Sequence, residues 1–169
     1  MKIKYLFALA ISLATYMSQA QVSVATHHGL HSPYNLGEYY KHEIGAAVFP
    51  YKLANADKIT VGFHGHYLYN INGGRMGLGI GYENILDDFS RQSFMGMFAY
   101  RPFAHITVIV SPGATLFNIN GESDISFSGH TEVIYEWAWR NIHFGPTVEY
   151  TYHKDYPHYS AGLHIGMGF

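Results

Sequence analysis

The feature that most constrains this chain is an alternation of apolar and polar residues with a period of two, which runs from about residue 43 to its end. The alternation is clearest in residues 142–153 and 158–169. There, large apolar residues fall on one face and small, polar or ionisable residues fall on the other. No 3.6-residue apolar period competes with this pattern over a useful length. The pattern therefore predicts an all-β fold.

Turn-forming residues divide the alternating region into eight segments. Asn72-Gly73-Gly74 is the clearest turn, and others are expected at 55–57, 87–88, Pro102, 118–121, Asn141 and 155–157. The predicted strands are 43–52, 58–71, 75–85, 91–101, 104–117, 123–140, 142–153 and 158–169. An even number of consecutive strands joined by short turns predicts an eight-stranded antiparallel up-and-down β-barrel.

Periodicity alone does not say which face of the barrel points inward. A soluble, lipocalin-like barrel would place its apolar face inside, whereas a transmembrane barrel would place it outside. Eight strands with about five large apolar side chains each would overfill the narrow interior of an eight-stranded barrel. Aromatic residues also fall near both ends of the strands, as in the girdles of membrane barrels: Tyr67, Tyr69, Tyr100, Trp137 and Trp139 at one end, and Tyr82, Tyr150, Tyr152 and Tyr159 at the other. Both observations favour a transmembrane β-barrel.

The N-terminus has the pattern of a secretory signal peptide. Lys2 and Lys4 precede an apolar stretch over about 5–14, and Ser18-Gln19-Ala20 offers small residues for cleavage. We therefore expect residues 1–20 to be removed, against the alternative of an uncleaved N-terminal anchor. The apolar stretch is too short to remain as a membrane-spanning helix, and no later stretch is long enough.

The mature chain is acidic and has no cysteine. Removing 20 of the 169 residues leaves 149, with eight basic and twelve acidic residues and a net charge near −4 when histidine is neutral. This charge argues against a nucleic-acid partner. Without disulfides, the exported chain must be stabilised by a core, by a membrane or by a closed hydrogen-bond network.

The strand count and the C-terminal residues resemble those of small bacterial outer-membrane barrels such as the OmpA transmembrane domain and OmpX. In that family a C-terminal aromatic residue, preceded by alternating apolar residues, is read by the barrel-assembly machinery; the matching residues here are Leu163, Ile165, Met167 and Phe169. The resemblance covers about 43–169 and implies an outer-membrane location, contact with outer-membrane lipid and a monomer. The loops are shorter than usual for such barrels, which argues against an adhesion or receptor role.

Residues 21–42 show no clear alternation and contain four histidines. Two interpretations remain open for them: a plug inside the lumen, or a disordered periplasmic segment that leads into the barrel.

Most histidines of the barrel fall on the face expected to point inward. Pairing neighbouring strands across their turns places His130 opposite His153, and His153 opposite His158, with Glu132 and Ser160 one step away. Cross-strand neighbours at about 5 Å allow imidazoles and a carboxylate to converge on Zn²⁺, Cu²⁺ or Ni²⁺. The alternative is that these side chains only fill a polar lumen. We expect a second set to form such a structural network: Arg101, His105, Glu136, Arg140, His143 and His164.

The sequence contains features of two further functions. His158-x-Ser160 is similar to the His-x-Ser of an outer-membrane lipid-A deacylase, but this pair points into the lumen and no acidic residue follows it. Inward glycines in strands 75–85 and 158–169 could leave a narrow channel, although strand curvature also explains them. The sequence therefore predicts a non-enzymatic outer-membrane barrel with a possible metal site, and a structural or narrow-channel barrel without a ligand as the alternative.

Overall fold

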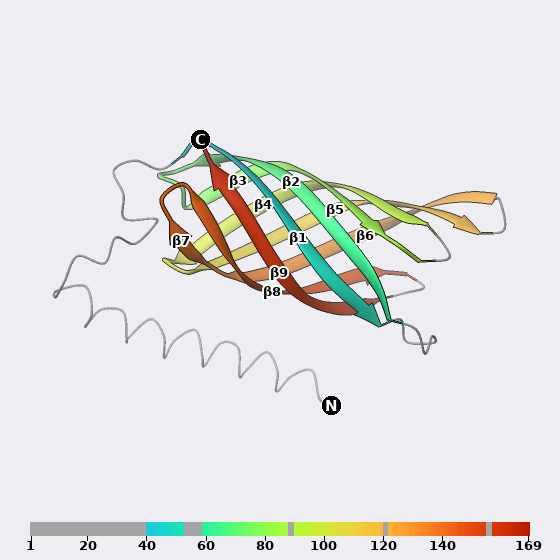
Figure 1. The fold of residues 1–169 in the computed structure, drawn as a ribbon. Coiled ribbons are helices and arrows are strands. Elements are labelled where there is room, and N and C mark those ends of the chain that lie inside the picture. The colour runs from blue at the N-terminus through green and yellow to red at the C-terminus, as the bar shows by residue number, and fades with distance from the viewer. Residues whose placement is uncertain (1–39, 53–58, 88–89, 120–121, 155–156) are drawn as a thin grey trace, which may run out of the picture. The chain divides into compact units, whose positions relative to one another are not determined.

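A computed structural model describes residues 40–52, 59–87, 90–119, 122–154 and 157–169. The predicted signal peptide and the lead-in as far as residue 39 lie outside these ranges. The strands run as follows (Figure 1): β1 His42–Lys52, β2 Ile59–Ile71, β3 Met76–Ile85, β4 Arg91–Phe103, β5 Ile106–Ile119, β6 Glu122–Tyr135, β7 Trp137–Trp139, β8 Ile142–His153 and β9 His158–Gly168. Within the described residues, no helix is long and apolar enough to cross a bilayer.

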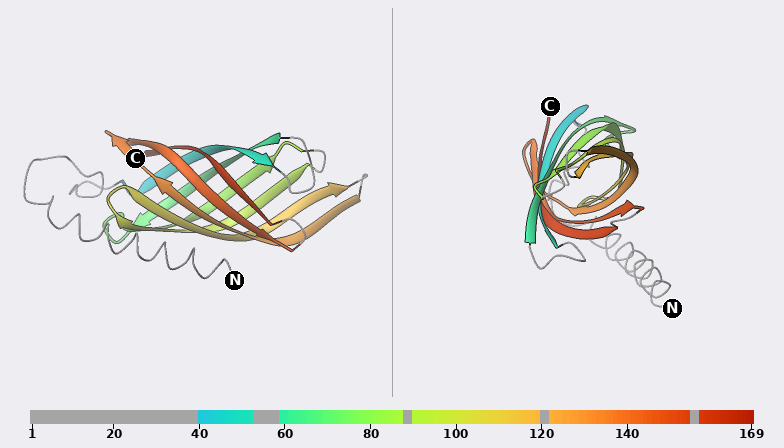
Figure 2. Two further views of the ribbon diagram at one scale, coloured as in Figure 1. Left: turned by 90° about the horizontal axis from the view of Figure 1, so that it is seen from below. Right: turned by 90° about the vertical axis from the view of Figure 1, so that its right-hand side faces the viewer.

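The strands close into one antiparallel barrel. Strands that follow one another in the sequence are paired, except that β6 and β7 both pair with β8, and β1 also pairs with β9. Viewed nearly along its axis, the barrel forms a ring of strands (Figure 2, right). The backbones of His42 and Phe169 exchange two hydrogen bonds of 3.0 and 2.8 Å where the first and last strands meet. The pairing of the first strand with the last closes the sheet, which is the condition for a β-structure to span a bilayer.

β6 and β7 are one strand interrupted at Glu136, so the barrel has eight strands. Both pieces pair with β8 in the same register, since Ile134 lies opposite Thr147 and Trp137 lies opposite Phe144. This register places Gly145 opposite Glu136 and Pro146 next to it, opposite Tyr135. Proline has no N–H to donate to the ladder, which explains why regular pairing stops there. The predicted eight-stranded fold is thus confirmed.

The outer wall is apolar, as the alternation predicts. Ile80 and Leu163 are 69% and 70% exposed, and the predicted aromatic residues Tyr69, Tyr100 and Trp139 also face outward. The four residues of the predicted assembly signal, 163, 165, 167 and 169, alternate outward along β9. A contiguous apolar exterior of this kind suits a lipid environment.

The inner face is not uniformly small and polar. Two apolar groups are buried inside the barrel: Leu68, Met95, Met97, Ala99, Ile109 and Ile134 form one, and Ala47, Phe49, Tyr51 and Ile85 form the other. Met97 also fills the space above Gly81, one of the inward glycines of β3. This packing at Gly81 favours the curvature explanation of the glycine over a water-filled path there.

The turns depart from prediction in three places. β4 continues through Pro102 to Phe103, and the β5–β6 hairpin is longer than expected, with Ile119 opposite Glu122. This hairpin extends beyond its neighbours (Figure 1). The turn before β8 contains Arg140 as well as Asn141, because Trp139 pairs with Ile142 and Arg140 has a positive φ of 57°.

Candidate functional site

The predicted row of three histidines is wrong in its register. His130 lies opposite Thr151, and His158 lies opposite Thr151 on the other side, whereas His153 lies opposite Ser128. Both predicted pairings are displaced by two residues. A two-residue displacement keeps each side chain on the inner face but moves it to another row, so only His130 and His158 share a row.

His130 belongs instead to a buried group that we call the glutamate cluster: His64, Glu83, His130, Glu132 and Glu149. His130 Nδ1 lies 3.0 Å from Glu149 Oε1 and 3.7 Å from Glu83 Oε2. The ring of His64 lies between two carboxylates, with Nε2 at 3.6 Å from Glu132 and Nδ1 at 3.7 Å from Glu149. The cluster brings together side chains from β2, β3, β6 and β8.

Hydroxyl groups complete the bonding of the glutamate cluster. Tyr51 donates a hydrogen bond of 3.0 Å to Glu83, Thr147 one of 2.7 Å to Glu132 and Thr151 one of 2.7 Å to Glu149. Each carboxylate therefore has at least one hydroxyl donor in addition to a nearby imidazole. A closed polar network of this kind can hold the strands of a narrow barrel together.

His153 and His158 are not members of that cluster, and Ser160 lies beside one of its glutamates. The ring of His153 meets Phe117 edge-on at 4.7 Å, and the ring of His158 meets Tyr51 at 5.0 Å. Ser160 is buried on the inner face with Glu149 as its cross-strand partner. Of the four residues predicted to bind metal, the structure thus brings His130 and Glu132 together and places His153 and His158 against aromatic rings.

In the second predicted set, Arg101 forms an ion pair with a residue that the sequence analysis missed. Its Nη2 donates to Glu43 Oε2 at 2.7 Å and its Nη1 to Asn70 Oδ1 at 2.9 Å. Asn70 also donates to the same Glu43 oxygen at 3.1 Å. Arg140 is not part of this set, because it lies exposed in its turn, 5.7 Å from the ring of Trp139.

Three members of the second set do converge, and we call Glu136, His143 and His164 the histidine cluster. One ligand atom from each lies within 4.8 Å of the other two. His164 is 2% exposed, and Glu136 accepts a hydrogen bond of 3.0 Å from the Thr107 hydroxyl. The side chain of His105 contacts the backbone of this cluster, with Nδ1 at 2.9 Å from the carbonyl oxygen of Glu136. The glutamate cluster contains a comparable triad in His64, Glu83 and Glu149.

Several inward ionisable residues were not predicted as site residues: Glu43, His64, His66 and Glu83 of the early strands, and Glu149 of β8. A signal for two of them was present. His64 and His66 alternate with the outward Phe63 and Tyr67 along β2, so their parity places both rings inside. Their contacts depend on closure of the barrel, which the parity of one strand does not reveal.

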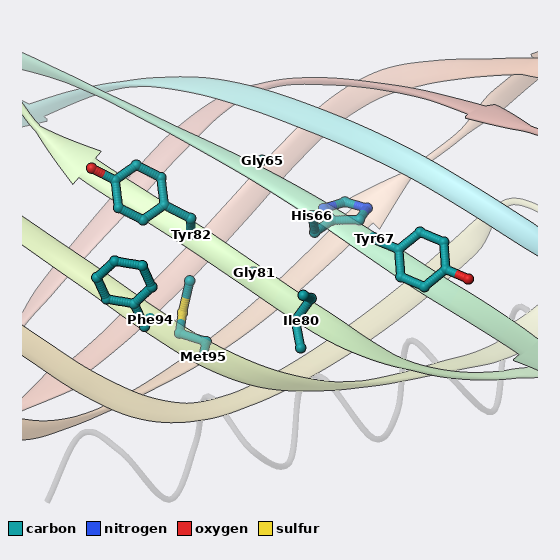
Figure 3. Close-up of a pocket in the computed structure, with 8 residues that line it drawn as sticks. All are labelled: Gly65, His66, Tyr67, Ile80, Gly81, Tyr82, Phe94 and Met95. Atoms are coloured by element: carbon teal, nitrogen blue, oxygen red, sulfur yellow. The ribbon is translucent and has the colours of Figure 1, made fainter.

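A shallow hollow of about 580 Å³ lies at the wall formed by β2, β3 and β4. Tyr67, Ile80, Tyr82 and Phe94 line it, together with Gly65 (Figure 3). The lining is mainly apolar and aromatic, which suits the acyl chains of a bilayer. It does not present converging ionisable groups as the two lumen clusters do.

Comparisons with known proteins identify the fold. No protein-family description matches the sequence, and no curated protein matches it. The structure is similar to the outer membrane protein Ail of Yersinia pestis, with a TM-score of 0.56 and 14% identity over 78% of this chain and 100% of Ail. It is also similar to the neisserial surface protein NspA, with a TM-score of 0.54 and 11% identity over 76% of this chain and 96% of NspA.

A designed transmembrane β-barrel gives a TM-score of 0.53 at 16% identity, over 78% of this chain and 100% of the design. At these identities the likeness concerns the fold alone. The chain has the fold of small eight-stranded outer-membrane β-barrels.

Proposed function

We propose that this chain is an integral protein of a bacterial outer membrane, that it is not an enzyme, and that its His-rich lumen binds a transition-metal cation. The outer-membrane location is supported by the apolar outer wall and by the fold shared with solved outer-membrane proteins. Insertion by the barrel-assembly machinery, contact with outer-membrane lipid and a monomeric state are parts of the same proposal.

The observation that carries the metal role is the convergence of buried imidazoles and carboxylates inside the barrel. Two triads each place three ligand atoms within 4.8 Å of one another. Imidazole and carboxylate together favour Zn²⁺, Cu²⁺ or Ni²⁺ over the hard cations Mg²⁺ and Ca²⁺, which prefer oxygen ligands alone. The ligands predicted from the sequence, His130 and Glu132, belong to the glutamate cluster, which contains one of these two triads.

The test is a calorimetric titration of Zn²⁺, Cu²⁺ and Ni²⁺ into the mature protein, folded in detergent. We expect saturable binding near one ion per chain, with weaker binding of Mg²⁺. A variant in which His64, His130, His143 and His164 are all alanine should not bind. The folded state of each sample is checked by its resistance to unfolding in detergent before boiling, which a closed barrel commonly shows. Absence of binding to the folded wild-type chain would disprove the metal role.

The second candidate is a purely structural barrel without a specific ligand. The bonding of the glutamate cluster favours it, since Tyr51, Thr147 and Thr151 already donate to its carboxylates. The same titration distinguishes the two functions, because a structural barrel would show no saturable heat of binding with any of these metals.

A hydrolase receives less support from the geometry. Ser160 faces the lumen, whereas an enzyme acting on membrane lipid needs its nucleophile at the lipid-facing wall. We therefore expect no lipid deacylation by the purified barrel. Activity that is lost in Ser160→Ala would overturn the non-enzymatic part of the proposal.

A further inference from the structure

Three imidazoles form a stack inside the barrel, beside the pairing of the first and last strands. The rings of His66 and His164 are parallel within 2°, with centroids 5.3 Å apart. The ring of His143 also stacks on that of His164, with centroids 5.4 Å apart and an angle of 24° between the ring planes. His66 and His164 are 7% and 2% exposed. The stack therefore places three potential metal ligands in a region from which solvent is nearly excluded.

The middle ring of the stack has unsatisfied nitrogens. Among the described residues, neither Nδ1 nor Nε2 of His164 has a hydrogen-bond partner, and the same is true of both nitrogens of His66. A buried polar group without a partner costs free energy, so such groups are rare and often mark an ion or a water. One nitrogen of His164 lies within 4.8 Å of a ligand atom of His143 and of Glu136.

We propose that the histidine cluster, Glu136, His143 and His164, is the metal site of the lumen. This inference rests on the proposed function and assigns it to one place. Two imidazoles and one carboxylate suit Zn²⁺, Cu²⁺ or Ni²⁺, and three protein ligands leave a fourth position for water or an exchangeable ligand. The site is therefore of the open kind, which releases its ion more readily than a structural site with four protein ligands.

The glutamate cluster is the weaker of the two places. Its triad of His64, Glu83 and Glu149 has one imidazole, and both carboxylates already accept hydrogen bonds from the hydroxyls of Tyr51 and Thr151. Glu149 also has His130 at 3.0 Å. The histidine cluster offers two imidazoles in place of one, and neither nitrogen of His164 has a hydrogen-bond partner among the described residues.

Two glycines provide the room that the stack needs. Gly45 and Gly166 face each other across β1 and β9. A Cβ atom at Gly45 would overlap the rings of His66 and His164, and one at Gly166 would overlap the ring of His143. Zinc bonds of about 2.1 Å place tetrahedral ligand atoms about 3.4 Å apart. His143 Nε2 and Glu136 Oε1, at 3.9 Å, must therefore move closer when the cluster binds an ion. The absence of side chains at the two glycines gives the rings the space that they occupy.

Glu43 and Arg101 set the charge next to the site. His143 Nε2 lies 3.5 Å from Glu43 Oε1 and 3.9 Å from Glu136 Oε1, so it is placed between two carboxylates. The other oxygen of Glu43 binds Arg101 at 2.7 Å. The positive charge of Arg101 is thus compensated locally by Glu43.

The experiment compares single-site variants of the detergent-folded mature barrel by titration with Zn²⁺ alone. We expect His164→Ala and His143→Ala to weaken binding about a hundredfold, and His130→Ala and His64→Ala to change it by less than about threefold. Gly166→Ala keeps every ligand but crowds His143, so it should weaken binding about tenfold. Gly129→Ala is the matched control, since a Cβ there meets no atom within 4 Å.

A spectroscopic measurement covers the case in which a variant folds poorly. Electron paramagnetic resonance of bound Cu²⁺ should show two coordinating imidazole nitrogens in the wild type and one in His143→Ala. If the wild type binds no metal, both the proposed function and this inference fail. If binding survives His164→Ala and is lost in His64→Ala, the proposed function stands and the assignment to the histidine cluster is wrong.

Discussion

Arg101 and Glu43 are joined inside the barrel by an ion pair of 2.7 Å, although they lie on strands that are not neighbours in the sheet. The pair connects β4 with β1, and Asn70 on β2 bonds to both side chains. Both charged residues are buried, at 4% and 6% exposure. Breaking a buried pair from one side leaves an uncompensated charge, which makes this contact a test of how the lumen stabilises the fold.

We predict that Arg101→Met lowers the free energy of unfolding by about 3–5 kcal/mol, because the Glu43 carboxylate remains buried without its cation. The double variant Arg101→Met with Glu43→Gln should recover a large part of this loss. Urea unfolding in lipid vesicles, followed by tryptophan fluorescence, measures both changes.

Arg140→Met is the control for Arg101→Met. Arg140 is exposed in its turn and contacts only the ring of Trp139 among the interactions described, so its loss should cost less than about 1 kcal/mol. Equal losses for the two arginine variants would show that the ion pair does not stabilise the barrel.

A second prediction concerns the glycine opposite the break between β6 and β7. A Cβ atom at Gly145 would overlap the backbone oxygen of Tyr135. Backbone atoms cannot move aside as a flexible side chain can, so Gly145→Ala should destabilise the barrel by about 1–3 kcal/mol. Gly129→Ala, in open space, should leave stability unchanged or raise it by up to about 1 kcal/mol. The same unfolding assay compares them, and similar values for both variants would contradict the close approach at Gly145.

A third prediction tests which face of the barrel meets lipid. Ile80 lies in the middle of β3 and is 69% exposed, whereas Tyr159 lies at the start of β9. Arginine on the lipid face costs about 2–4 kcal/mol at the midplane and about 0–1 kcal/mol near the interface. Ile80→Arg should therefore destabilise the barrel in vesicles far more than Tyr159→Arg. Equal, small effects at both positions would mean that the apolar face is exposed to water.

The strands and their faces could be predicted because each depends on local sequence. Alternation with period two sets the faces, and turns such as Asn72-Gly73-Gly74 carry their own signal, here three consecutive residues with positive φ. The turn before β8 gave a weaker signal. Arg140 adopts a left-handed conformation there, at φ 57°, which is uncommon for this residue type. That turn therefore set a register that the sequence did not reveal.

The candidate site could be predicted only in part, because its geometry depends on register and closure. The two-residue displacement kept His130 on the inner face but moved it away from His153 and beside Glu149. Contacts across the lumen, such as that of His143 with Glu43, join residues that are distant in the sequence and on strands that are not paired. A single-strand pattern identifies which side chains point inward, but not which of them meet.

A final prediction concerns the C-terminal residue Phe169. Its ring stacks on that of His42, with centroids 5.6 Å apart and an angle of 17° between the ring planes. The residue is 55% exposed. The resemblance to small outer-membrane barrels implies that this residue is read during assembly, so Phe169→Ala should reduce the amount of folded barrel in cell membranes several-fold. The same variant, refolded in vitro, should lose no more than about 1 kcal/mol of stability, since a half-exposed ring buries little area. Tyr159→Ala, an outward aromatic at the other end of β9, is the matched control. Normal accumulation of both variants in membranes would show that the Phe169 side chain is not needed for assembly. A loss of folded Phe169→Ala in vitro as large as that in cells would show that the side chain acts in packing.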